Sequence, residues 1–140
     1  MADIDIHNRT DRYVAAWNEP DAVRRRAAIC ELWSADAVHV LRPPREILQT
    51  GEGLGFDRLV LEGRGHHALE FRVTRAYEEL VAPGTFVFRS RGNADRLHEV
   101  VQFNREMALR DGGEVAGVGL EILVLGPDGR IVSYYQSIEG

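Results

Sequence analysis

The sequence predicts an α+β domain in which helices precede a run of long strands. In the first third of the chain, apolar residues recur every three or four positions, which is the period of an amphipathic helix. From residue 85 onward, β-branched and aromatic residues are frequent, and glycine-containing turns separate the apolar runs, as in antiparallel strands. Because the two kinds of element are segregated along the chain, we expect a mixed or antiparallel sheet and not a doubly wound parallel one.

Composition indicates one soluble domain over residues 1–140. The chain is 44% hydrophobic and 28% charged, which is ordinary for a globular protein. Its net charge is −5 and its longest basic run is RRR at 24–26, so no nucleic-acid partner is expected. No stretch approaches the roughly 20 apolar residues of a membrane span, and no signal peptide is evident, so we expect a cytoplasmic protein without membrane contact. With one cysteine, an internal disulfide is excluded.

Two helices are predicted before residue 36. One face of the first carries Ile6, Thr10, Tyr13, Val14 and Trp17. Residues 18–21 (NEPD) end it, and a proline is tolerated in the opening turn of the next helix. In the second helix, the spacing predicts an apolar stripe of Val23, Ala27 and Cys30, with Cys30 in the core. The basic triplet 24–26 then forms the solvated face.

A short strand over residues 37–41 and a third helix are expected next. Residues 43–63 have no clear periodicity, apart from a possible short strand at 58–61, and so long a connection is often a lid or a binding loop. The third helix has an apolar stripe of Leu69, Val73, Ala76 and Leu80. Its end is marked by the Pro-Gly pair at 83–84.

Four strands are predicted in the second half, at 85–90, 97–109, 115–125 and 131–138, with turns at 111–113 and 126–129. A long curved sheet over three helices has a concave face that the helices can close into a pocket. Gly117 and Gly119 fall inside a strand, where glycine marks a bend, a bulge or a close approach.

Five segments carry a resemblance to a known family: RYVAAWN at 12–18, ELWSADAV at 31–38, LHEVVQF at 97–103, GLE at 119–121 and DGRI at 128–131. Their order and spacing resemble the SnoaL-like branch of the nuclear transport factor 2-like superfamily, over nearly the whole chain. The resemblance implies a cone of strongly curved sheet and three N-terminal helices around a deep, mostly apolar internal cavity, usually in a homodimer. Its enzymes generally need no cofactor; they include ketosteroid isomerases, polyketide cyclases, scytalone dehydratase and limonene epoxide hydrolases.

The resemblance points to Tyr13 and Glu121 as an oxyanion hole. Both match positions that, in ketosteroid isomerases, donate hydrogen bonds to an enolate oxygen, and a carboxyl group kept protonated by burial can donate one. The alternatives are a core tyrosine and a solvent-facing glutamate. Strand alternation places Glu121 on the same face as Gly117, Gly119, Leu123 and Leu125, which favours the interior.

At the position of the general base, the sequence differs from the isomerases. Their general-base aspartate would fall at or next to Leu41, which cannot accept a proton, so steroid isomerisation by that mechanism is disfavoured. His39 lies two residues earlier on the same strand face, where it is either a general base or a hydrogen-bonded core residue. His98 could face the cavity and pair with Glu121 or Tyr13.

Other histidines and Arg105 also bear on the site. His66 shares a helical stripe with Leu69 and Val73 and is expected in the pocket, whereas His67 is expected to be solvated. No histidine pair has the i, i+4 spacing of a helical zinc site, so no metal is expected. Epoxide hydrolases use an acid–arginine–acid arrangement; here Arg105 lacks the acid two residues later and Gln136 replaces the other, which leaves only an Arg105-centred variant open.

The sequence therefore predicts a cofactor-independent acid–base enzyme of the cyclase, isomerase or dehydratase type, acting on an apolar carbonyl-containing secondary metabolite. Tyr13 and Glu121 would stabilise the enolate oxygen, and His39 or His98 would move the proton. The expected cavity walls, suited to a planar or polycyclic ligand, comprise Trp17, Leu41, His66, Phe88, Phe103 and Tyr135. The alternatives are a non-catalytic small-molecule binding protein of the same fold and a plain dimeric scaffold.

Overall fold

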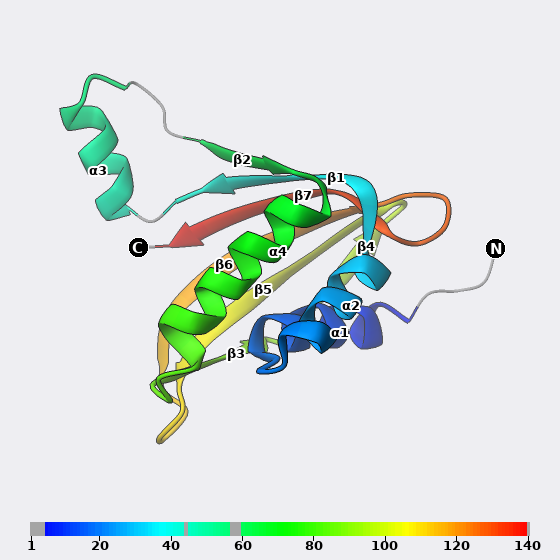
Figure 1. The fold of residues 1–140 in the computed structure, drawn as a ribbon, viewed down its shortest axis with the longest axis horizontal. Helices are drawn as coiled ribbons and strands as arrows, with labels where there is room; N and C mark the ends of the chain where they lie inside the picture. The colour runs from blue at the N-terminus through cyan, green and yellow to red at the C-terminus, as the bar shows by residue number, and fades with distance from the viewer. Residues whose placement is uncertain (1–4, 44, 57–59, 140) are drawn as a thin grey trace.

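A computed structural model of the chain describes residues 5–43, 45–56 and 60–139. Its elements, in order, are α1 (Ile6–Asn18), α2 (Ala22–Leu32), β1 (Trp33–Arg42), α3 (Arg45–Gly53), β2 (Leu61–Arg64), α4 (Gly65–Ala76), a π-helical turn η1 (Tyr77–Val81), β3 (Phe86–Ser90), β4 (Asp95–Leu97), β5 (Val100–Leu109), β6 (Val115–Leu125) and β7 (Ile131–Glu139). The α+β class is confirmed (Figure 1).

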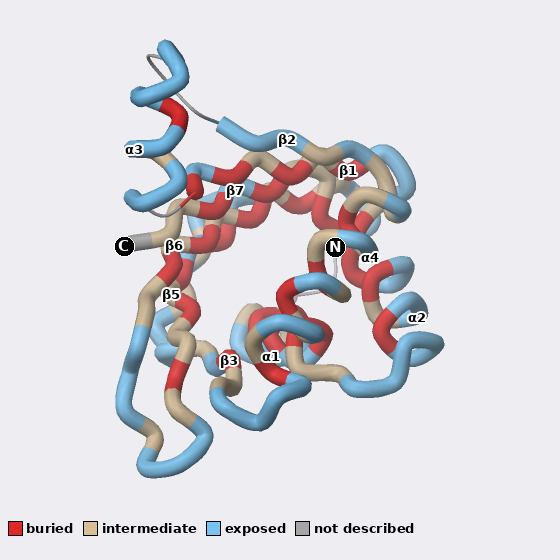
Figure 2. Tube along the Cα trace, turned by 60° about the vertical axis from the view of Figure 1, so that its left-hand side comes forward, coloured by how far each residue is buried: buried red, intermediate tan, exposed pale blue. Residues whose placement is uncertain are grey.

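The seven described strands form one mixed sheet. Its order is β2-β1-β7-β6-β5-β3, with β4 paired to β5. Strands β1 and β7 run parallel, and the other pairs are antiparallel. Figure 2 shows the sheet bent into an arc with α1, α2 and α4 on its concave side, where the buried residues gather. The interior between helices and sheet is therefore the place where a cavity can form.

Aspartates begin the first two helices. The carboxylate of Asp5 accepts hydrogen bonds from the backbone N–H groups of His7 and Asn8, both at 3.1 Å. Asp21 accepts in the same way from Val23 and Arg24, at 2.9 and 3.0 Å. Such caps satisfy N–H groups that have no partner within the helix, and each typically stabilises it by about 1 kcal/mol.

The predicted inner face of α2 was wrong. Val23 is 79% exposed and Cys30 is also exposed, whereas Ile29 and Leu32 are buried. Arg25, from the triplet expected to be solvated, is buried as well. Its guanidinium donates to the carbonyl oxygen of Glu19 at 2.7 and 3.0 Å and lies 4.5 Å from the centre of the Tyr77 ring. Those contacts compensate the buried charge, so a stripe judged only by side-chain polarity was placed on the wrong side of the helix.

Part of the connection at 43–63 is helical, which its sequence did not indicate. Residues 45–53 form α3, which stands apart from the other helices beyond the sheet (Figures 1 and 2). Residues 58 and 59 of the short strand expected at 58–61 lie outside the described residues, and β2 begins at Leu61. Within the described part of the chain, no helix is long and apolar enough to cross a membrane.

Candidate functional site

Glu121 is the centre of a buried polar cluster. It lies in the middle of β6 and is 0% exposed. Its Oε2 accepts a hydrogen bond from the Tyr134 hydroxyl at 2.6 Å and a longer one from the Tyr13 hydroxyl at 3.4 Å. Its Oε1 accepts from Gln136 Nε2 at 2.9 Å and forms an ion pair with Arg105 Nε at 3.1 Å. We call these five residues the Glu121 cluster.

Strand register brings most of the cluster together. Glu121 lies directly opposite Gln136 on β7 and Phe103 on β5. Directly paired residues point to the same side of a sheet, as do residues two positions apart. Arg105 and Tyr134 therefore face inward as well. Tyr13 comes from α1 and closes the cluster through its hydroxyl, whose one proton is shared between the Tyr134 hydroxyl and Glu121 Oε2.

The cluster differs from the oxyanion hole that the sequence predicted. The inward position of Glu121 is confirmed, but both of its oxygens accept hydrogen bonds from protein groups. Burial, followed by the charge of Glu121, raises the pKa of both tyrosines well above 10.0, so each keeps its hydroxyl proton. The Tyr13 hydroxyl is engaged by protein groups within the cluster.

A cavity of about 250 Å³ lies beside the cluster. Its walls come from α4, η1 and four strands, and comprise Arg72, Ala76, Leu80, Phe88, Arg105, Met107, Gly117, Val118, Gly119 and Ile138. We call it the Arg105 cavity. Most of its walls are apolar, and a Cβ atom on Gly117 would meet nothing closer than Met107 Cε at 3.6 Å. A largely apolar cavity is therefore present, but of the six predicted wall residues only Phe88 lines it, and arginines supply its charged groups.

Arg105 connects the cavity to the cluster. It is 5% exposed, and its Cζ atom lies 4.4 Å from the ring centres of both Trp17 and Phe88. Burial lowers the pKa of Arg105, but Glu121 and the two tyrosines raise it by more, and the net shift is upward. Its buried Nη1 has no hydrogen-bond partner among the described residues. The guanidinium is thus fixed in place with a free donor.

Arg72 is the second arginine of the cavity wall. Its Nη2 donates a long hydrogen bond to Gln136 Oε1 at 3.5 Å, and its Cζ lies 5.3 Å from the centre of the Trp17 ring. Its buried Nε has no partner among the described residues. Burial and the nearby Arg105 lower the pKa of Arg72. Sequence reasoning missed this residue, although its spacing from Leu69 and Ala76 on α4 placed it on the inner stripe.

His39 is buried close to the Glu121 cluster. It is 4% exposed and stacks on the Tyr134 ring, with ring centres 4.3 Å apart. Burial and the charges of Arg72 and Arg105 lower its pKa to about 4, so the ring is neutral at pH 7. Its Nε2 has no partner among the described residues. His39 is therefore a buried, neutral imidazole, and it is not among the residues that line the cavity.

Three candidates lie away from the cavity. His98 is exposed in the turn between β4 and β5, with a φ of 53°, because the strand expected at 97–109 is interrupted there. Tyr135 is 45% exposed, because β7 turns its neighbour Tyr134 inward. His66 Nε2 lies 2.8 Å from the Trp33 carbonyl oxygen, a contact that joins α4 to β1.

The remaining wall candidates are buried. Phe88 lines the cavity, and Trp17 lies against Arg105 at its edge. Phe103 packs in the core against Tyr13, with ring centres 5.5 Å apart, and Leu41 is buried without lining the cavity.

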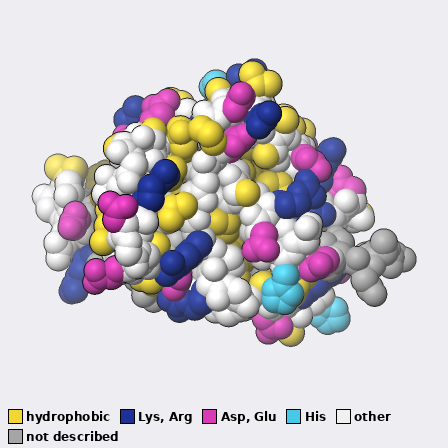
Figure 3. Space-filling view, turned by 90° about the horizontal axis from the view of Figure 1, so that it is seen from below, with side chains coloured by type: hydrophobic (Ala, Val, Ile, Leu, Met, Phe, Trp, Pro, Cys, Tyr) yellow, Lys and Arg dark blue, Asp and Glu magenta, His cyan; other side chains and the backbone are white. Residues whose placement is uncertain are grey.

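Among the described residues, no group of three or more His, Cys, Asp or Glu is arranged to hold a metal ion. Figure 3 shows the face seen from below in Figure 1, where apolar side chains gather at the centre among charged ones.

Three solved structures have a similar fold. A "putative isomerase of the SnoaL-like family" from Agrobacterium tumefaciens is 22% identical, with a TM-score of 0.74, over 95% of this chain and 96% of its own. A SnoaL-like protein of unknown function from Burkholderia thailandensis is 16% identical, with a TM-score of 0.64, over 99% and 100%. An NTF-2 like protein of unknown function from Burkholderia xenovorans is 14% identical, with a TM-score of 0.59, over 96% and 82%.

The chain has the NTF2-like fold. The resemblance found in the five sequence segments is therefore confirmed for the architecture. No protein-family model matches the sequence, and no curated protein matches it significantly. The NTF2-like fold carries many activities, so function has to be argued from the cavity itself.

Proposed function

We propose that this protein binds a small, largely apolar molecule in the Arg105 cavity, with an oxygen atom of that molecule accepting a hydrogen bond from Arg105. The observation that carries the proposal is the buried, unpartnered Nη1 of Arg105 on the wall of an apolar cavity. A buried donor without an acceptor costs about 1–3 kcal/mol, which a ligand oxygen would recover.

The contacts of Arg105 support a binding role. The rings of Trp17 and Phe88 both pack against its guanidinium, and Glu121 fixes its Nε. The donor is therefore oriented before a ligand arrives, and little side-chain entropy is lost on binding. In this proposal Glu121 and the two tyrosines are positioning residues, because they hold Arg105 and do not contact the ligand.

A second candidate is an acid–base enzyme of the cyclase, isomerase or dehydratase type, acting on an apolar carbonyl-containing secondary metabolite. Arg105 would stabilise the enolate oxygen, and the neutral imidazole of His39 would accept the proton. The unpartnered Nε2 of His39 favours this candidate. Binding alone is favoured by the cavity wall, because its described residues include neither a histidine nor a carboxylate.

The test uses 2-acetylnaphthalene, an apolar ketone with exchangeable protons beside its carbonyl group. We expect it to quench tryptophan fluorescence on binding, and we expect Gly117→Leu, which fills the cavity, to reduce its affinity at least tenfold. Arg105→Met, combined with Glu121→Gln to keep the cluster neutral, should weaken binding by about tenfold. Arg24→Met is the control, since Arg24 is exposed on α2. Unchanged affinity in both cavity variants would contradict the proposal.

The same ketone separates binding from catalysis. In D₂O, an acid–base enzyme should speed deuterium incorporation at the methyl group beside the carbonyl, and His39→Phe should remove that acceleration. Exchange at the buffer rate, together with binding that depends on Arg105, would reject the enzymatic candidate for this carbonyl class and support the binding function.

A further inference from the structure

The charges around the Arg105 cavity do not balance. Among the described residues, Arg72 and Arg105 contribute two positive charges to its wall. Glu121 is the acid paired with Arg105, and Arg72 forms no ion pair with a described acid. One cation at the cavity is therefore left without a counter-ion.

Glu121 cannot supply the missing charge to Arg72. Its Oε1 is engaged by Arg105 and Gln136, and its Oε2 by the two tyrosine hydroxyls. Gln136 separates Glu121 from Arg72, since it donates to the first and accepts from the second. The lowered pKa of Arg72 agrees with a guanidinium that burial and Arg105 disfavour as a cation.

Each arginine of the cavity wall keeps a donor without a partner among the described residues. Arg105 Nη1 and Arg72 Nε are both buried and unpartnered, and both residues line the same cavity. A carboxylate has two oxygens with about four acceptor sites, so one group can accept from both arginines. The rest of the wall is apolar and includes Leu80, Phe88, Met107 and Ile138.

We propose that the ligand of this cavity is a monocarboxylate with an apolar body, whose carboxylate pairs with Arg72 and Arg105. The inference rests on the proposed binding function and adds the charge of the ligand. One carboxylate neutralises the one excess cation, so a dicarboxylate would reintroduce an unpaired buried charge. An apolar cavity without the arginines would prefer a neutral ligand, because a carboxylate loses more hydration on entering it.

The test compares two probes of nearly the same shape, 2-naphthoate and 2-naphthamide, by calorimetry at pH 7.5 and low salt. We expect the carboxylate to bind at least tenfold more tightly than the amide, as charge-assisted hydrogen bonds require. Arg72→Met should remove most of that preference, because it weakens binding of the carboxylate much more than binding of the amide. Arg72→Lys should retain part of the preference, and Arg24→Met should leave it unchanged.

The outcomes separate this inference from the function on which it rests. Equal affinities for the two probes, with 2-acetylnaphthalene still bound through Arg105, would overturn the inference that the ligand is a carboxylate. The proposed binding function would still hold. Failure of all three naphthalene probes to bind would overturn both. A preference for 2-naphthoate that persists in folded Arg72→Met would also overturn the inference, because the missing counter-ion of Arg72 is its basis.

Discussion

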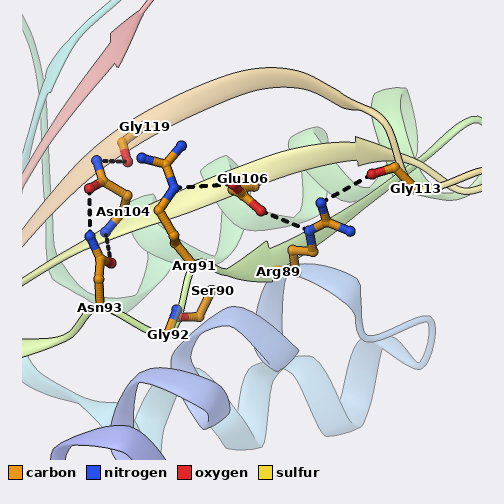
Figure 4. A network of polar contacts seen from close by, with 9 residues as sticks. All are labelled: Arg89, Ser90, Arg91, Gly92, Asn93, Asn104, Glu106, Gly113 and Gly119. Atoms are coloured by element: carbon orange, nitrogen blue, oxygen red, sulfur yellow. Dashed lines mark hydrogen bonds and ion pairs between the residues drawn. The ribbon is translucent and has the colours of Figure 1, made fainter.

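A group of two arginines and one glutamate lies on each side of the sheet, and the two groups have different surroundings. On the outer face, Arg89 and Arg91 each donate through Nε to the carboxylate of Glu106, at 2.8 and 3.1 Å (Figure 4). On the inner face, Arg72 and Arg105 accompany Glu121. Each group has two arginines and one glutamate, and neighbouring residues of β5 contribute to both.

The two groups differ in their exposure to water. The side chains of Arg89 and Arg91 are 45% and 44% exposed, so solvent satisfies the charge and the donors that Glu106 does not reach. The inner arginines have buried N–H groups without partners. An excess cation is therefore unremarkable on the outer face, whereas on the inner face it is the basis of the proposed ligand site.

The largest expected effect comes from removing the acid on each face. Glu121→Ala leaves a buried arginine unpaired and two tyrosine hydroxyls without their acceptor, so we expect the free energy of unfolding to fall by about 3–5 kcal/mol. Glu106→Ala is the matched control, and its loss should be about 0–1 kcal/mol. Urea denaturation measures both. Equal losses would show that burial does not distinguish the two networks.

A pH titration tests the inner face next. The pKa of His39 is about 4 in the folded state against 6.5 in the unfolded chain, so the unfolded chain binds more protons between these values. Stability due to this group is complete above pH 6.5 and is lost as the pH falls toward 4, by about 3 kcal/mol in total. His39→Phe should flatten that part of the stability curve. A slope that persists in the variant would assign the effect to other groups.

Salt should produce the smallest difference. The arginines of the outer ion pairs are exposed and screened, so the loss caused by Arg89→Gln should be below about 1 kcal/mol in low salt and should vanish near 1 M NaCl. The loss caused by Glu121→Ala should persist, because water and ions do not reach that cluster. Denaturation curves at both salt concentrations measure the comparison, and equal salt dependence on the two faces would contradict it.

The sequence predicted more of the fold than of the candidate site. The period-two pattern of β6 placed Glu121 inside, and the period of α1 placed Tyr13 and Trp17 inside. It did not identify Arg72, and it expected His98 and Tyr135 at the cavity. Arg72 was overlooked because an arginine on an apolar stripe is normally solvated, and only its neighbours show that it is not.

A resemblance in five segments pointed to the NTF2-like architecture. The sequence by itself determined most of the succession of helices and strands, and the residues that face inward along α1 and β6. These properties depend on local periodicity, which the chain carries without reference to distant residues. Only the tertiary structure decided which inward residues meet. Strand register placed Gln136 and Arg105 around Glu121, and the docking of α4 placed Arg72 at the same cavity, because such contacts depend on how separate elements pack.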